Sequence, residues 1–304
     1  TFPGGDPAVT TLLDNPSIRP GGMLRGHVIV VAEEDLAIDR VTFSLVAEVD
    51  SGVPLVFHRE AVAGPFAVLA RSGRPVPFSL PMPWQLPFTH LPGQLVPAQP
   101  LPGSGVTLRT ELTAVDAVDA SSAQPVYVHP LPVQERVLEA FAGSGFGFRH
   151  AVLRTGWIRN VRQTLPIYQE IGLWPPPDYA GLVTELEVIF LADPAGADVI
   201  LGLDRWAGLV TRERPAVARF RVAHDTAADM DWDRVVKGWF RDAVQRHTAG
   251  HRVAQHVVPG PPGHSAQPWA PDPPPDCSGS DRDGDEGQDR DGRRRPLRRA
   301  RMRG

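Results

Sequence analysis

Cysteine is almost absent from this sequence: its 304 residues include a single one, Cys277. A lone thiol cannot form an internal disulfide, and no cysteine cluster is present to ligate a metal, so a disulfide-stapled secreted scaffold is excluded. Long apolar runs are absent as well. None approaches the roughly 18 residues of a membrane-spanning helix, and the first residues, TFPGGDPAV, lack the basic and apolar segments of a secretory signal. We therefore expect a cytoplasmic protein with no membrane span.

Positive charge is in the minority over most of the chain. The formal net charge is -4, and residues 1–250 alone carry a net charge of -6. An acidic body offers no general surface for nucleic acid or anionic lipid. The closing RRRPLRRARMRG holds seven Arg, but seven acidic residues precede it between Asp276 and Asp291, which favours self-neutralisation over nucleic-acid binding. Binding of a specific nucleic acid is not expected.

The first part of the chain, from Val9 to His129, alternates between apolar and polar residues and has Gly and Pro at the breaks. The apolar strand faces are Val41, Phe43, Leu45, Ala47 and Val49; Leu55, Phe57, Ala61 and Ala63; Val76, Phe78 and Leu80; and Val106, Leu108, Leu112 and Ala114. A period of two in roughly seven short runs predicts the antiparallel strands of a β-sandwich. Residues 82–105 are rich in proline, which predicts a long surface loop.

Helical periodicity occurs twice. Pro132 opens a short pattern that ends at Gly143, with apolar positions Val137, Leu138, Phe141 and Ala142. A second pattern follows Asp231, a helix-capping residue, with apolar positions Trp232, Val235, Val236, Trp239, Phe240, Ala243 and Val244. Gly250 should end this second helix. Its polar face mixes both signs of charge, which favours packing on a domain over binding to a membrane surface.

A second alternating set lies between the two helical patterns and predicts another sandwich. Its strand residues are Leu186, Val188 and Phe190, followed by Val199, Ile200, Val217, Phe220 and Val222. Beyond residue 250 the chain is Pro-rich and then highly charged, so no core can be built there. The predicted organisation is an N-terminal β-sandwich at 1–130, a connector helix at 131–147, a second β-sandwich with its terminal helix at 148–250, and a disordered tail at 251–304.

Eight segments stand out in order along the chain. They are LDNPSIRPGGMLRGHVIV (Leu13–Val30), RVTFSLVAEV (Arg40–Val49), FHREAVAGPF (Phe57–Phe66), PVPFSLPMPWQLP (Pro75–Pro87), VTLRTELTAVDAVD (Val106–Asp119), VHPLPVQERVLEAF (Val128–Phe141), RQTLPIYQEI (Arg162–Ile171) and ELEVIFLADP (Glu185–Pro194). Together they resemble the SpoOM family of sporulation-control proteins. The resemblance implies an all-β chain of two arrestin-like β-sandwich modules joined by a linker, and control of sporulation or cell-cycle events through protein contacts. It implies no catalytic residue.

Two serines lie in glycine-rich sequence, Ser144 in AGSGFG and Ser104 in PGSGV. A nucleophile elbow needs Gly two residues before the serine, where this chain has Ala142 and Pro102. The glycines around Ser144 also lack the Lys-Ser/Thr ending of a P-loop, and they follow a helix rather than a strand. We therefore interpret them as the C-terminal cap of that helix.

The histidines do not predict a metal site. His247, His251 and His256 are spaced by four and five residues, but no Glu follows the first, and Gly250 should end the helix before the second. The remaining histidines on or beside strands are His27, His58, His90, His129, His150 and His224. Such isolated residues are more often surface or half-buried side chains than catalytic groups. We expect neither a metal nor a cofactor.

Carboxylates and aromatic residues give no assigned site either. Glu185 and Glu187 lie two apart on one strand face, which predicts two solvated neighbours rather than a glycosidase pair across a substrate. Four aromatic residues could line a carbohydrate or peptide groove, although sandwiches more often use such residues in the core. They are Trp157, Tyr168, Trp174 and Tyr179.

No catalytic, cofactor-binding or metal-binding residue is therefore assigned. The first hypothesis is a non-enzymatic cytoplasmic adaptor in the sporulation or cell-division machinery, with protein partners docking on sheet edges and loops between the modules. The alternative is a carbohydrate- or small-ligand-binding β-sandwich, and a hydrolase is the third hypothesis.

Overall fold

The computed structural model describes residues 7–91, 93, 95, 101–116, 119–158, 160–179, 181–203, 218–226 and 228–254. Within these residues it contains fourteen β-strands, two α-helices and one short 3-10 helix, so the predicted all-β class is confirmed. The strands form three sheets, and the described residues lie within one compact unit, residues 1–257. Val217, Cys277 and residues 255–304, which hold most of the predicted tail, lie outside the described residues.

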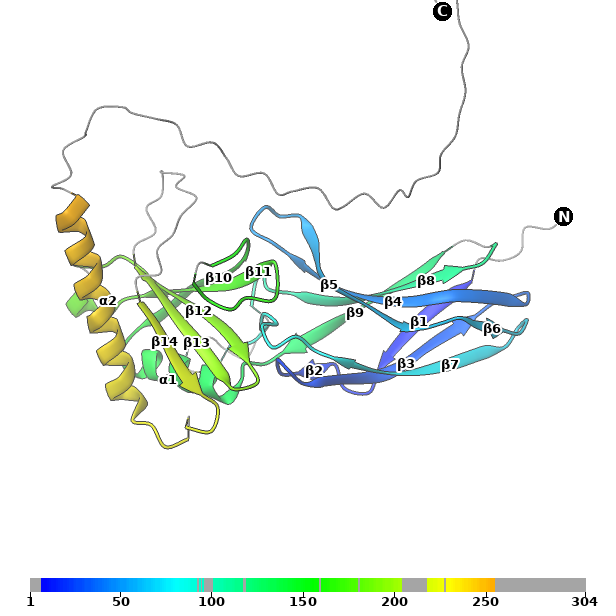
Figure 1. The fold of residues 1–304 in the computed structure, drawn as a ribbon, viewed down its shortest axis with the longest axis horizontal. Coiled ribbons are helices and arrows are strands. Elements are labelled where there is room, and N and C mark those ends of the chain that lie inside the picture. Colours follow the sequence, from blue (N-terminus) through cyan, green and yellow to red (C-terminus); the bar gives the residue numbers. More distant parts are fainter. Residues whose placement is uncertain are drawn as a thin grey trace, which may run out of the picture. The chain divides into compact units, whose positions relative to one another are not determined.

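The first module consists of strands β1 to β9, arranged in two sheets (Figure 1). Their bounds are β1 (Ala8–Leu13), β2 (Ser17–Ile18), β3 (Met23–Val31), β4 (Leu36–Glu48), β5 (Pro54–Ala63), β6 (Phe66–Val68), β7 (Gly73–Pro81), β8 (Val106–Ala114) and β9 (Ala120–Val128). One sheet has the strand order β1-β3-β7, and the other has the order β2-β9-β8-β4-β5, with β6 also paired to β4.

The core of the first module lies between these two sheets. The predicted apolar face of β4 is buried, with Val41, Phe43 and Leu45 at most 1% exposed. Phe43 meets Phe78 of β7 edge to face, with 4.5 Å between the ring centroids. Because β4 and β7 belong to different sheets, this contact is made across a β-sandwich, as the alternation predicts.

Strand β5 departs from the predicted alternation. Phe57 is buried, but Ala61, which should share its face, is exposed. The pairing of β5 with β4 shifts register at two places. Since each shift adds a residue to one strand, it moves the following side chains to the opposite face, and a regular period of two does not hold along β5.

The second module contains α1 (Pro132–Gly143), β10 (Gly147–Thr155), β11 (Ile167–Trp174), the 3-10 helix η1 (Pro177–Tyr179), β12 (Leu186–Asp193), β13 (Gly196–Leu203), β14 (Ala218–Ala223) and α2 (Trp232–Ala254). Its strands form an antiparallel sheet in sequence order. Both helices contact each other and strand β13, and α2 also contacts β14 (Figure 1). Among the described residues, the layer packed on this sheet is therefore a pair of helices rather than a second sheet.

The ends of the helices follow local rules with one exception. Pro132 and Gly143 bound α1 as predicted, and the carboxylate of Asp231 accepts the N–H of Arg234 at 3.2 Å, which caps α2. However, α2 continues past Gly250 to Ala254, so its predicted end is wrong. A glycine inside a helix costs only about 1 kcal/mol and does not by itself stop it. Neither helix is long and apolar enough to cross a membrane over its described residues.

Candidate functional site at the junction of the two modules

Residues 82–91, here called the junction segment, follow β7 and contact both modules. The sequence predicts a surface loop here, but Met82, Leu86, Phe88 and Leu91 are all less than 9% exposed. The prediction of a surface loop is wrong because the backbone N–H and C=O groups of this proline-rich segment find hydrogen-bond partners when the segment is buried. Side-chain amides and hydroxyls replace the ladder hydrogen bonds that a strand would make.

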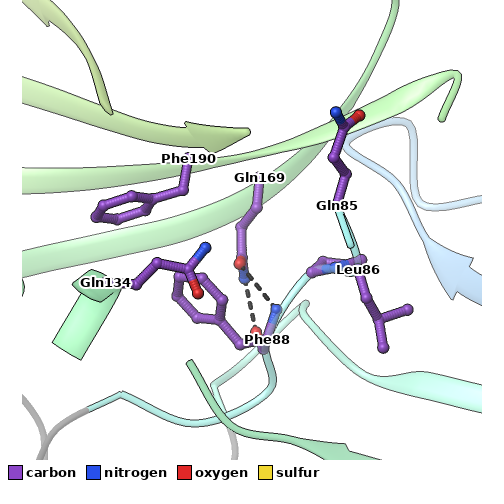
Figure 2. Close-up of a pocket in the computed structure, with 7 residues that line it drawn as sticks. Gln85, Leu86, Phe88, Gln134, Gln169 and Phe190 are labelled. Atoms are coloured by element: carbon purple, nitrogen blue, oxygen red, sulfur yellow. Dashed lines mark hydrogen bonds between the residues drawn. The ribbon is translucent and has the colours of Figure 1, made fainter. Parts of the chain in front are cut away.

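Two glutamines bind the backbone of the opposite module. Gln85 of the junction segment donates from Nε2 to the carbonyl of Arg162 at 2.8 Å and accepts the N–H of Thr164 at 2.7 Å. In the reverse direction, Gln169 of β11 accepts the N–H of Phe88 at 3.1 Å and donates to its carbonyl at 2.8 Å (Figure 2). Each amide therefore satisfies one backbone donor and one backbone acceptor, and the pair at Phe88 is fully buried.

The pocket drawn in Figure 2 lies between these groups. Its lining is Gln85, Leu86, Pro87, Phe88, Gln134, Gln169 and Phe190. The space has room for about one ordered water molecule. Three amides and no titratable or nucleophilic side chain line it, so this pocket can hold a polar group by hydrogen bonds but offers no acid, base or nucleophile.

Aromatic contacts add an apolar component to the junction. The rings of Phe88 and Phe190 lie 6.1 Å apart, and Phe190 belongs to β12 of the second module. Trp84 stacks on His224, which follows β14, with 5.5 Å between the ring centroids. The junction segment thus touches the second module through alternating aromatic and amide side chains.

A charged contact joins the modules at a second place. The turn between β4 and β5 carries Asp50, whose backbone N–H donates to the carbonyl of Leu153 in β10 at 2.9 Å. Arg154 donates to the Asp50 carboxylate at 2.6 Å and to that of Glu170 at 2.8 Å. Glu170 is fully buried, and Arg154 is 15% exposed.

The charge of Arg154 is held by these two carboxylates. Burial by itself lowers the pKa of the guanidinium, but the hydrogen bonds to Asp50 and Glu170 outweigh this and keep the pKa above its ordinary value. Arg154 is therefore a permanent cation that links one acid of the first module to one acid of the second.

The connector helix α1 is packed into the core of the second module. Val137, Leu138 and Phe141 are all 0% exposed, which confirms their predicted burial. At the start of the helix, Arg19 of the first module donates to the carbonyl of Pro130 and lies 3.0 Å from Glu135. The helix is therefore tied to both modules, through its apolar face and through its first turn.

The two serines in glycine-rich sequence, Ser144 and Ser104, lie at a helix cap and in the junction. Ser144 is the C-cap of α1, and the N–H of Gly145, which has a positive φ of 88°, donates to the carbonyl of Ala142 at 2.9 Å. The predicted cap is confirmed. Ser104 is fully buried and receives a hydrogen bond from Gln169 at 3.2 Å, so it belongs to the junction.

The predicted carboxylate and aromatic groups are separated by the fold. Glu185 and Glu187 are only 4% and 6% exposed, so their predicted solvation is wrong; Glu185 lies 2.8 Å from Arg149. Tyr179 packs on Phe240 in the helical layer, whereas Tyr168 packs on the other face of the sheet. Tyr168 and Tyr179 therefore do not line one groove, and Trp157 and Trp174 are 64% and 49% exposed.

No group of three or more His, Cys, Asp or Glu side chains within the described part of the chain could hold a metal ion. His247 lies on α2. The side chain of His251 and the whole of His256 are not among the described parts of the structure. The expectation of no metal and no cofactor stays a prediction.

A family model described as SpoOM protein matches residues 2–207, which cover the first module and most of the second. The chain belongs to the SpoOM family. It is 26% identical over 212 residues to the sporulation-control protein spo0M of Bacillus subtilis (strain 168), a match that covers 67% of this chain and 77% of that protein. The crystal structure of Spo0M from Bacillus subtilis matches with a TM-score of 0.66 and 23% identity, over 79% of this chain and 99% of that chain. The SpoOM resemblance and its fold are therefore confirmed.

Sequence reasoning missed the polar residues of the junction in this SpoOM chain. Gln85 and Gln169 are neutral amides without a motif, and Asp50 and Arg154 are separated by more than a hundred positions in the sequence. One signal was present: Gln85 lies between apolar residues in a proline-rich segment, where a polar side chain needs a partner if its neighbours are buried.

Proposed function

We propose that this chain controls sporulation as a non-enzymatic adaptor, and that it binds protein partners in a manner that depends on the relative placement of its two modules. Its SpoOM membership and its similarity to the sporulation-control protein of Bacillus subtilis support the sporulation role. The junction supports the adaptor mechanism. We also propose that it acts in the cytoplasm and needs no nucleic acid, metal or cofactor.

The observation that carries the mechanism is the chemistry of the junction. Gln85, Gln169 and Arg154 each make directed contacts with the opposite module. Such bonds hold one orientation of the modules, and water can replace them if the modules separate, whereas the apolar contact between Phe88 and Phe190 would have to be broken as well. This favours a protein whose two modules have a preferred relative orientation, which a partner can recognise on binding or can change. The proposed division of the chain is the predicted one, with the boundary before α1.

The edges of the sheets limit where a partner can add a strand. Strand β7 is an edge of the three-stranded sheet and carries Pro75, Pro77 and Pro81. Proline has no backbone N–H, and it is tolerated on an edge strand where that position faces away from the sheet. Three of the backbone donors along the free edge of β7 are therefore missing, which disfavours docking by strand addition there.

The experiment compares partner capture by the parent chain with capture by a loosened one. Gln85→Ala combined with Gln169→Ala should expand the particle in small-angle scattering, and it should reduce both capture from sporulating cells of the native host and rescue of a deletion strain. Gln124→Ala, on β9, is the control. If the loosened particle captures the same proteins and restores sporulation as well as the parent, module placement is not the mechanism. If deletion leaves sporulation unchanged, the role itself is wrong.

A further inference from the structure

His90 and His129 face each other beside the connector helix. Their rings stack with 4.9 Å between centroids and 25° between planes, and the phenol of Tyr127 stands edge-on to His90 at 5.8 Å. Both imidazoles are half-buried. Two imidazolium rings at this separation repel each other, so the stack accepts a first proton more readily than a second.

Four other histidines of the described part have a different kind of neighbour. His27 lies 3.9 Å from Asp14, His58 lies 3.8 Å from Glu60, His150 lies 3.4 Å from Glu185, and His224 lies 2.9 Å from the carbonyl oxygen of Asp193. Each of these four imidazoles thus lies beside a carboxylate or carbonyl oxygen rather than beside a second imidazole. The His90–His129 pair instead places two groups of the same potential charge together.

The hydroxyl of Thr89 connects His90 to the main chain. Its Oγ1 lies 2.7 Å from His90 Nδ1, accepts the N–H of Val128 at 2.9 Å, and lies 3.3 Å from the carbonyl oxygen of Val128. A hydroxyl has one proton to donate. A neutral His90 can accept that proton at Nδ1. A protonated His90 can only donate to Oγ1, and the hydroxyl then donates to the Val128 carbonyl, so Thr89 keeps its hydrogen bonds and acid acts on this place through repulsion between the two stacked rings.

These contacts lie where the junction segment meets the connector. The N–H of Thr89 donates to the carbonyl of Val128 at 2.8 Å, and Val128 is the last residue of β9. Two residues further, Pro130 is held by Arg19, and α1 begins at Pro132. A change at Thr89 and Val128 therefore acts on the point from which the second module leaves the first.

We propose that the His90–His129 stack makes the attachment of the junction segment to β9 sensitive to pH, so that mild acid loosens the connector. Arg19 binds the carbonyl of Pro130, the residue after His129, and lies 3.0 Å from Glu135, so this cation and this carboxylate offset each other. This inference concerns the local junction and holds whether or not the chain is an adaptor.

The pKa of His90 also supports a loss of stability in mild acid. Its burial, and then the charge of His129, lower the pKa of His90 below 6.5. The folded chain therefore keeps His90 neutral to lower pH than the unfolded chain does. The resulting contribution to stability is complete above about pH 6.5 and is lost as the pH falls through the folded pKa.

A side-chain NMR titration of the full chain tests the electrostatic coupling. In His129→Gln the pKa of His90 should rise, because the like charge is removed. His129→Asn removes the same charge and gives a second measurement of the His90 pKa if His129→Gln does not fold. His27→Gln is the matched control and should leave the pKa of His90 unchanged. If the pKa of His90 is the same in the parent and in the His129 variants, the stack is not coupled and the proposal is overturned.

Hydrogen exchange of the Val128 amide tests the structural consequence. Its protection, corrected for intrinsic exchange, should fall severalfold between about pH 7.5 and about pH 5.5 in the parent, on either side of the histidine range. In His90→Gln the protection should stay constant, because no imidazolium forms. If the ratio of Val128 protection at the two pH values is the same in the parent and in His90→Gln, protonation of His90 does not affect the main-chain hydrogen bond. The proposed switch would then be rejected.

Discussion

Gln169 and Phe88 form a two-bond pair between a side-chain amide and a peptide backbone. The amide accepts the Phe88 N–H at 3.1 Å and donates to the Phe88 carbonyl at 2.8 Å (Figure 2). Gln169 is 7% exposed and Phe88 is 2% exposed, so water does not readily compete for these groups. The pair gives Phe88 the two backbone hydrogen bonds that a neighbouring strand would supply, while Pro83 and Pro87 within the segment lack the N–H groups that strand pairing needs.

Replacing Gln169 by Leu should destabilise the protein by about 2–6 kcal/mol. The substitution preserves approximate size but leaves a buried donor and a buried acceptor of Phe88 without partners, and each orphaned group costs about 1–3 kcal/mol. Urea unfolding followed by fluorescence measures the effect. Gln124→Leu is the control, because Gln124 is half-buried on β9 and away from the junction contacts. Equal losses in the two variants would refute a special role for the Gln169 amide.

Replacing Arg154 by Met should cost more than replacing its exposed partner. The change removes a guanidinium that hydrogen-bonds the fully buried carboxylate of Glu170, for which we expect a loss of about 3 kcal/mol or more. Asp50→Asn removes only the partly exposed end of the contact and should cost about 0–1 kcal/mol. Denaturant midpoints of the two variants give the comparison. The reverse ranking would show that the charge of Asp50, not the neutralisation of Glu170, matters at this contact.

The Asp193–Arg221 pair should give the protein an acid-dependent loss of stability. The hydrogen bond from Arg221, at 2.5 Å, lowers the pKa of Asp193, and the N–H groups of Ala195 and Gly196 lower it further. A depressed folded pKa stabilises the fold above about pH 3.8, and this contribution is lost as the pH falls through the folded value. The stability difference between the parent and Asp193→Asn should therefore shrink below about pH 3.8. A difference that stays constant from neutral pH to acid would contradict the assignment.

Replacing Trp239 by Asp should destabilise the second module by about 2–4 kcal/mol. The Trp239 ring stacks on Phe220 of β14 at 4.6 Å, and a carboxylate there would be buried against apolar side chains. Lys237→Asp adds a carboxylate to the exposed side of the same helix and should change little. Thermal unfolding compares them. Unchanged stability for Trp239→Asp, with loss of vesicle binding, would support a membrane-surface helix instead.

Much of the fold follows from local patterns. The period of two along β4 identifies Val41, Phe43 and Leu45 as core residues, and all three are buried. Capping chemistry at Pro132 and Asp231 sets the starts of both helices. Such signals succeed because they depend on neighbours within a turn or a strand. They fail at β5, where register shifts depend on the partner strand and leave no mark in β5 itself.

The sequence by itself determined the strand and helix content, the SpoOM resemblance and the apolar residues of the core, because burial of apolar surface follows the period of each element. Only the tertiary structure decided that a proline-rich segment is buried, that Gln85 and Gln169 exchange bonds across the modules, and that Asp50 reaches Arg154. The physical reason is range. A hydrogen bond or ion pair is made between atoms within about 3 Å, and the chain brings those atoms together only after the modules have packed.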